Sequence, residues 1–173
     1  MWLYLLRHGE AEEKAGKDDA ARALTKAGRE DVSSVAMAVA PLLHRPLRIL
    51  SSPYLRAEQT AEIFRETAAA AQKLEPCEQM LPESSWGALR PLLEKLAGEG
   101  AGAIIAVGHN PSISEMCGTI VGGAGDVRIP LSKGAIACLE IDNLHGRPAG
   151  ELKWLITPKT VRATASKGKS GAP

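Results

Sequence analysis

Short apolar runs that end abruptly in polar or glycine residues constrain the fold of this chain more than any other feature. The clearest run is Ala103–Val107 (AIIAV), which is followed directly by Gly108-His109-Asn110-Pro111. Similar runs lie at residues 2–6 and 47–50. Apolar runs of about 4–8 residues between turn signals are typical of strands that are buried on both faces. We therefore expect these three segments to be strands of one covered sheet.

Segments with helical periodicity separate the runs. After Thr25, which can act as an N-cap, apolar residues recur at three- and four-residue spacing as far as Leu43. A weak strand is expected near residues 77–81. Strands that alternate with helices predict an α/β fold with three layers, α/β/α, around a mostly parallel central sheet. Further helices are expected at residues 53–71, 86–96 and 111–120, and a hairpin of two late strands near 135–141 and 152–156.

The length and the charge of the chain limit its organisation and its partners. A chain of 173 residues fits one domain, which we assign to residues 1–158, and residues 159–173 are expected to be a flexible basic tail. Without the four basic residues of that tail, the body carries 17 Lys and Arg against 20 Asp and Glu. A mildly acidic body argues against nucleic-acid binding. No apolar run reaches the roughly 18 residues of a membrane span, so no membrane association is expected.

The cysteines point to a reducing compartment. Cys77, Cys117 and Cys138 are odd in number, widely spaced, and form no CxxC pair. A disulfide framework or a zinc site is therefore not expected, and the cytoplasm is the simplest location. We interpret all three as small core or near-surface residues, and Trp86 and Trp154 as packing residues. Nothing in the sequence requires an oligomer, so we expect a monomer.

Polar residues of related chemistry follow three of the expected strands. Arg7 and His8 follow the first strand, Arg56 lies one turn into the helix after the second, and His109 follows the buried run at 103–107. Because ligands bind beyond the carboxyl ends of the strands in such sheets, we expect these four side chains to converge. Guanidinium groups match phosphate oxygens, and an imidazole is a good nitrogen nucleophile near neutral pH. The set predicts a phosphoryl-transfer site.

Four sequence motifs, taken in order, indicate a protein family. They are LRHGE at residues 6–10, LTKAG at 24–28, SPYLRAEQTA at 52–61 and VGHNP at 107–111. In sequence, order and spacing they resemble the signatures of the histidine phosphatase superfamily, which is also called phosphoglycerate-mutase-like. Within that superfamily, the short chain and the Arg22-x-Leu-Thr pattern resemble the SixA-like phosphohistidine phosphatases.

The resemblance implies a role for each site residue. His8 would be the nucleophile and become a phosphohistidine, and Arg7, Arg56 and His109 would hold the phosphoryl group until water attacks the phosphoenzyme. At the rim of the pocket, Arg22, Asn110 and Gly9 would bind substrate. No metal or cofactor is implied. Zinc bound by His8 and His109 is an alternative, but the two arginines would repel a cation and no third ligand is evident.

The general acid is less well defined than the other site residues. Larger relatives place an acid after the third strand, and the candidates here are Glu83 and Glu10. An imidazole leaving group, with a conjugate-acid pKa of about 6.5, needs less protonation than an alcohol. Between Glu83 and Gly100 there is also room for one helix and no lid. Both observations favour phosphohistidine on a protein as the substrate.

Two other functions remain open from the sequence alone. The chain could be a phosphomonoesterase for a small phosphorylated molecule, which would require a real general acid. It could also be a module that binds phosphoproteins without turning them over, although the presence of all four core residues argues against this. The predicted partner is therefore a histidine-phosphorylated protein of a phosphorelay or phosphotransfer system, or a small phosphorylated molecule, with no nucleic acid and no membrane.

Overall fold

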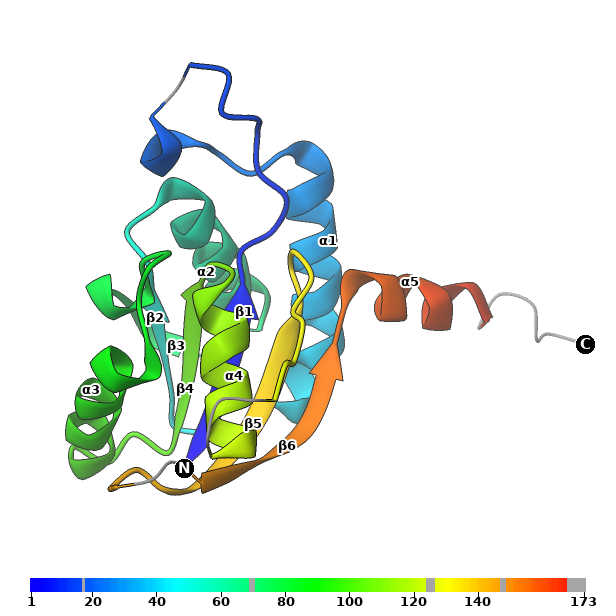
Figure 1. Cartoon of the computed structure of the whole chain (residues 1–173). Coiled ribbons are helices and arrows are strands. Elements are labelled where there is room, and N and C mark those ends of the chain that lie inside the picture. The colour runs from blue at the N-terminus through cyan, green and yellow to red at the C-terminus, as the bar shows by residue number, and fades with distance from the viewer. Residues whose placement is uncertain (17, 69–70, 124–126, 147–148, 168–173) are drawn as a thin grey trace, which may run out of the picture.

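A six-stranded sheet forms the centre of the molecule, with helices on both faces (Figure 1). The computed structural model describes residues 1–16, 18–68, 71–123, 127–146 and 149–167. The strands lie in the order β3-β2-β4-β1-β5-β6. Strands β1 to β4 run parallel, and β5 and β6 are antiparallel additions at one edge, as expected for a mostly parallel sheet. The bounds are β1 Trp2–Arg7, β2 Leu47–Ser51, β3 Ala71–Pro76, β4 Ala103–Gly108, β5 Ile136–Asn143 and β6 Ala149–Ile156.

The helices cover the sheet in two layers. Helices α1 (Lys26–Val39) and α2 (Leu55–Thr67) pack on one face, and α3 (Trp86–Gly98) and α4 (Ser112–Gly122) pack on the other. Figure 1 shows α4 in front of the sheet and α1 behind it. Helix α1 begins as predicted, because the Thr25 side chain accepts a hydrogen bond from the Gly28 amide. No helix in the described ranges is long and apolar enough to cross a membrane.

The packing of the β1 side chains explains why this strand is apolar up to its last residue, Arg7. Leu3 and Leu5 join the cluster under α3 and α4, while Tyr4 and Leu6 join the cluster under α1 and α2. Because side chains alternate across a strand, a strand covered on both faces has no polar position. The expected packing residues take their places in the same clusters: the three cysteines are buried and free, Trp86 is buried, and Trp154 packs against the α1–α2 layer.

The third strand lies earlier in the chain than predicted. The expected strand at 77–81 is instead a short 3₁₀ turn at Glu78–Met80, and the strand is β3 at Ala71–Pro76. The predicted helix also ends at Thr67 rather than within the alanine tract, of which residues 69–70 lie outside the described part. Strand β3 pairs with β2 at the edge of the sheet. An edge strand needs fewer apolar residues, so its sequence (AQKLEP) carries a weak strand signal.

The expected flexible tail is a helix over most of its length. Helix α5 spans Pro158–Lys167 and projects from the body beyond the end of β6 (Figure 1). The Thr157 hydroxyl accepts a hydrogen bond from the Thr160 amide at the start of the helix. Val161 then packs against the core, and Arg162 pairs with Asp31 on α1. The sequence analysis did not predict this helix, because the segment is polar and its contacts with α1 and the core are tertiary. The flexibility of the tail stays a prediction. Residues 168–173 lie outside the described part.

Candidate active site

The ends of β1, β2 and β4 meet at one edge of the sheet, as the sequence predicted. Arg7 in β1 is in register with Gly108 in β4, and Ser51 in β2 is in register with Val107. The residues that follow these strands therefore surround one cavity, which has a volume of about 320 Å³. Its walls are formed by Arg7, His8, Ala11, Asp19, Arg22, Arg56, Pro82, His109, Asn110 and Lys133.

His8 is held in a single tautomer. Its Nδ1 lies 2.7 Å from the carbonyl oxygen of Gly9. Because a carbonyl only accepts hydrogen bonds, Nδ1 carries the hydrogen and Nε2 carries the lone pair. Nε of Arg56 donates to that Nε2 at 3.3 Å. The unprotonated Nε2 thus lies beside a guanidinium group, at the edge of the cavity.

Both histidines are neutral at neutral pH. Burial lowers the pKa of His8 from 6.5 to about 4, the hydrogen bond to Gly9 opposes this shift, and the charges of Arg56 and Arg7 add to it. Burial, followed by the charges of His8 and Arg56, lowers the pKa of His109 to about 3. The two ring centroids are 5.0 Å apart. A neutral imidazole is the nucleophilic form, so the environment of His8 keeps it reactive.

His109 is oriented by a serine that the sequence analysis had not singled out. Nε2 of His109 lies 2.8 Å from the Ser52 hydroxyl, at the end of β2. The edge of the Tyr54 ring approaches the His109 ring, with the centroids 5.1 Å apart. Nδ1 of His109 is buried and has no hydrogen-bond partner among the described residues. Buried polar atoms are normally paired, so this nitrogen is available to a ligand of the cavity.

Arg7 has a donor available in the same way. Its Nη1 donates to the Leu131 carbonyl at 2.9 Å, which fixes the guanidinium plane. Its Nε is buried and has no hydrogen-bond partner within the described ranges. Asn110 supports the same loop, because its amide donates to the Leu131 carbonyl at 3.1 Å and accepts from Ser114 at 2.9 Å. A guanidinium with an unused N–H at a cavity suits a phosphoryl oxygen or another anion.

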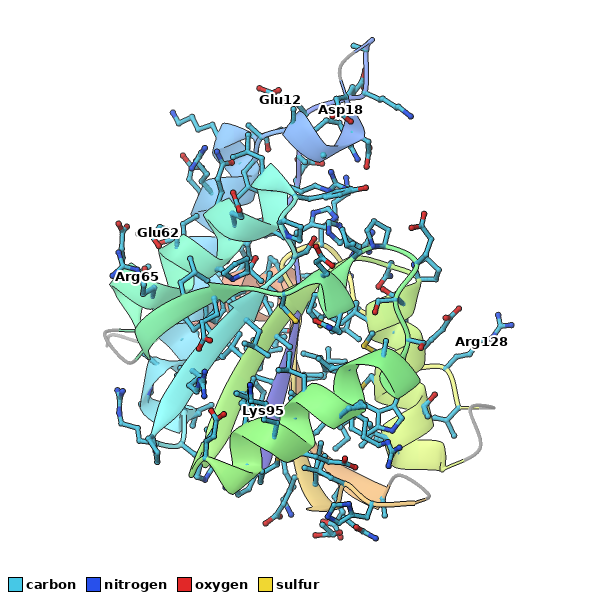
Figure 2. All side chains as sticks on the ribbon, turned by 90° about the vertical axis from the view of Figure 1, so that its left-hand side faces the viewer. Glu12, Asp18, Glu62, Arg65, Lys95 and Arg128 are labelled. Carbon is cyan, nitrogen blue, oxygen red and sulfur yellow. The ribbon has the colours of Figure 1, made fainter. Side chains whose placement is uncertain are left out.

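Arg56 is paired with an acid that the sequence analysis missed. Its Nη2 donates to Oδ2 of Asp19 at 2.9 Å, and its Nη1 donates to the Asp19 carbonyl at 2.6 Å. Arg22 binds the other carboxylate oxygen of Asp19 at 2.8 Å. Glu62 lies on α2 as well, six residues after Arg56. Glu62 instead pairs with Arg65 on the outer surface of α2 (Figure 2).

The two candidate acids and Gly9 lie outside the cavity wall. Glu83 is exposed beside Pro82, which does line the cavity. Glu10 pairs with Lys133 at 3.3 Å, and both side chains are half exposed. Gly9 is buried, and its amide donates to the Thr60 hydroxyl at 3.1 Å. A Cβ at Gly9 would lie 2.6 Å from a Val32 methyl group, so close packing explains the glycine.

Asp19 and Lys133 gave no signal that sequence reasoning could have used. Both belong to polar loops without periodicity, and only the folded chain brings them to the cavity. Ser52 is the first residue of the SPYLRAEQTA motif and follows a predicted strand, so its position could have identified it as a site residue. Among the described residues, no third His, Cys, Asp or Glu joins the two site histidines in a group that could hold a metal ion.

Comparisons with known proteins agree with this geometry. The model of the histidine phosphatase superfamily (branch 1) matches residues 3–96, more than half of the chain. An uncharacterized protein of Picosynechococcus is 33% identical over 166 residues, covering 92% of this chain and 98% of that protein. Phosphohistidine phosphatase SixA of Escherichia coli is 25% identical over 162 residues, covering 94% and 97%.

A solved structure extends the likeness to three dimensions. The structure of the protein histidine phosphatase SixA complexed with tungstate superimposes with a TM-score of 0.82 and 25% sequence identity. The superposition covers 93% of this chain and 99% of the SixA chain. The predicted phosphoglycerate-mutase-like fold is thus confirmed. The chain belongs to the histidine phosphatase superfamily, of which it is a SixA-like member.

Proposed function

We propose that this protein is a phosphohistidine phosphatase that works through a covalent phosphohistidine on His8. The observation that carries the proposal is the fixed tautomer of His8, whose Nε2 lone pair lies beside Arg56. The similarity to SixA, a phosphohistidine phosphatase, supports the same substrate class. We propose histidine-phosphorylated proteins of phosphorelay or phosphotransfer systems as substrates and the cytoplasm as the location.

In the first step, His8 takes the phosphoryl group from the substrate. Arg7, Arg56 and His109 bind the phosphoryl oxygens, and Nε2 of His8 attacks phosphorus in line with the leaving nitrogen. A P–N bond to His8 forms as the P–N bond of the substrate breaks, and its electron pair stays on the substrate imidazole. With a proton already on its second ring nitrogen, that imidazole leaves as a neutral molecule. The Gly9 carbonyl keeps the proton on Nδ1 of His8.

In the second step, water releases the phosphate. The water oxygen attacks phosphorus, the P–N bond to His8 breaks, and the electron pair returns to Nε2. Both protons of the water stay with the phosphate product. The same arginines that held the substrate phosphoryl group bind the charge that develops on the equatorial oxygens. No step of this cycle requires a metal ion.

The acids of the site favour a nitrogen leaving group over an oxygen one. Asp19 is the one carboxylate among the described residues that line the cavity. Burial raises its pKa, but hydrogen bonds and charges from Arg56 and Arg22 outweigh burial, so that the pKa of Asp19 is lowered overall. Asp19 therefore holds no proton at neutral pH. An alcohol leaving group needs a general acid, whereas neutral imidazole does not.

The test is a comparison of kcat/KM on a phosphohistidine substrate and a phosphoserine substrate. A histidine-phosphorylated carrier protein should be hydrolysed at least about 100-fold more efficiently than a serine-phosphorylated peptide. Glu83→Gln should change neither value by more than about twofold, because Glu83 is exposed outside the cavity. Faster turnover of the ester, with a collapse in Glu83→Gln, would instead support a small-molecule phosphomonoesterase. Stable binding of the carrier without phosphate release would support a non-catalytic phosphoprotein-binding module.

A further inference from the structure

Asp19 occupies an unusual position for a carboxylate in a site built for an anion. Oδ2 accepts from Nη2 of Arg56 at 2.9 Å, and Oδ1 accepts from Nε and Nη2 of Arg22 at 2.9 and 2.8 Å. The Asp19 carbonyl accepts a further bond from Nη1 of Arg56 at 2.6 Å. One residue therefore holds two guanidinium groups, and it holds Arg56 through two of its three nitrogens.

The third nitrogen of Arg56 points to the nucleophile. Nε donates to Nε2 of His8 at 3.3 Å, and the Arg56 side chain is 4% exposed. A guanidinium group is planar and rigid. Once Asp19 fixes Nη1 and Nη2, the position of Nε follows. The edge of Arg56 that carries Nε is thereby directed to the place where phosphorus must lie during attack by His8.

The loop that carries Asp19 is itself closed and fixed to α2. Its base is joined by a bridge between Ala11 and Leu24 and by a bond from the Glu12 amide to the Ala23 carbonyl at 2.9 Å. The Leu24 amide donates to Gln59 of α2 at 2.8 Å. Arg56 lies on the same helix. Asp19 and Arg56 are therefore presented to each other by two anchored elements.

We propose that Asp19 is a positioning residue, which sets the orientation of Arg56 toward His8 and the bound phosphoryl group. Its effect on turnover rests on the proposed phosphatase function, whereas its effect on anion binding does not. The carboxylate is unsuited to contact the phosphoryl group itself, since two negative groups repel each other. Its contribution comes through Arg56.

The change in oxyanion affinity when Asp19 is replaced distinguishes a positioning role from simple charge repulsion. If the Asp19 charge mattered only as a repulsive field, its removal would strengthen the binding of an oxyanion in the cavity. If Asp19 positions Arg56, its removal releases the guanidinium and weakens binding. Hydrogen bonds to charged groups are strong enough for the second effect to reach about tenfold or more in affinity.

The experiment measures tungstate affinity by isothermal titration calorimetry on the full chain. Tungstate is a suitable probe because it is bound in the solved SixA structure. Affinity should fall from the wild type to Asp19→Asn and further to Asp19→Ala, which cannot accept a hydrogen bond. Asp18→Asn is the matched control. Asp18 lies on the same outer loop (Figure 2), and the Ala20 amide is the one described partner of its side chain, so this control removes the same charge without releasing Arg56.

The proposal is overturned if either Asp19 variant binds tungstate as tightly as the wild type or more tightly, or if Asp18→Asn weakens binding equally. Asp19→Asn is isosteric and is the variant expected to fold, which thermal unfolding will verify. A second readout uses Arg56→Lys, which has one nitrogen in place of three. In that background, Asp19→Asn should change tungstate affinity by less than about twofold, and a full effect there would contradict positioning through Arg56. Weakened tungstate binding without any phosphohistidine turnover by the wild type would leave this proposal standing and reject the proposed function.

Discussion

Nδ1 of His8 lies 2.7 Å from the carbonyl oxygen of Gly9, the next residue in the chain. Gly9 itself packs against α1 with no room for a side chain. The contact with the Gly9 carbonyl places the proton of the neutral imidazole on Nδ1, so that Nε2 is unprotonated and its lone pair accepts a hydrogen bond from Nε of Arg56. The Gly9 carbonyl thus keeps Nε2 in the form that can attack phosphorus.

The first prediction concerns the pH dependence of activity. Because the pKa of His8 is lowered to about 4, the free enzyme keeps the nucleophilic neutral form down to mildly acidic pH. The value of kcat/KM on a histidine-phosphorylated carrier should stay level between about pH 8 and 5 with respect to His8 and fall as pH drops through 4. Rapid-quench rates, corrected for spontaneous hydrolysis of the substrate, provide the measurement. An acid limb centred near 6.5 would contradict the account.

The second prediction concerns stability at low pH. The folded pKa of His8, about 4, lies below its unfolded value of 6.5, so the unfolded state binds a proton first as pH falls. The stabilisation is complete above pH 6.5, decreases between 6.5 and about 4, and amounts to about 3 kcal/mol for His8. Urea unfolding at pH 7.5 and 4.5 should show a smaller difference in His8→Gln than in the wild type. The exposed His145→Gln is the control and should leave the difference unchanged.

The third prediction concerns Ser52, which is fully buried and bonds to Nε2 of His109 at 2.8 Å. Ser52→Ala leaves that nitrogen unpaired, so the free energy of unfolding should fall by about 1–3 kcal/mol. Because His109 also loses its orientation, kcat should fall about tenfold. Ser51→Ala removes an equally buried hydroxyl that bonds to a backbone carbonyl, and it should lower stability while kcat stays within twofold. Equal kcat values in the Ser52 and Ser51 variants would show that Ser52 does not orient His109 for catalysis.

The fourth prediction concerns the packing of α1 against the loop after His8. A Cβ at Gly28 would lie 2.2 Å from the Glu10 carbonyl oxygen, so Gly28→Ala must displace that loop. We expect a loss of about 1–3 kcal/mol of stability and a loss of activity at pH 7. Gly87→Ala near the start of α3 meets nothing closer than 3.7 Å and should stabilise by about 0.5–1 kcal/mol. Thermal unfolding and phosphate release measure both variants, and a neutral Gly28→Ala would contradict the packing.

The core of the site was predictable because topology alone brings it together. Arg7 ends one buried parallel strand, His8 follows it, and His109 follows another, and such strands end at the same edge of a sheet. Arg56 was predictable for a related reason, since it begins the helix that follows β2. Strongly apolar runs mark those strands in the sequence, so the residues after them could be located by counting.

Asp19 and α5 could not be found in this way. Asp19 reaches the cavity through a loop whose shape depends on hydrogen bonds to a residue far away in the sequence, Arg56. The polar composition of Pro158–Lys167 favours disorder, and the helix depends on its contacts with α1 and the core. Local sequence does not report such tertiary contacts.

The most direct test of the central claim is a single-turnover reaction with a histidine-phosphorylated carrier protein, quenched in alkali and analysed by intact mass. The wild type should gain one phosphoryl group transiently and then release phosphate, because Nε2 of His8 is unprotonated and faces the cavity as the nucleophile. His8→Ala should gain none and release none above the spontaneous rate. Phosphate release by the wild type without any adduct at early times, or an adduct that persists in His8→Ala, would show that His8 is not the nucleophile.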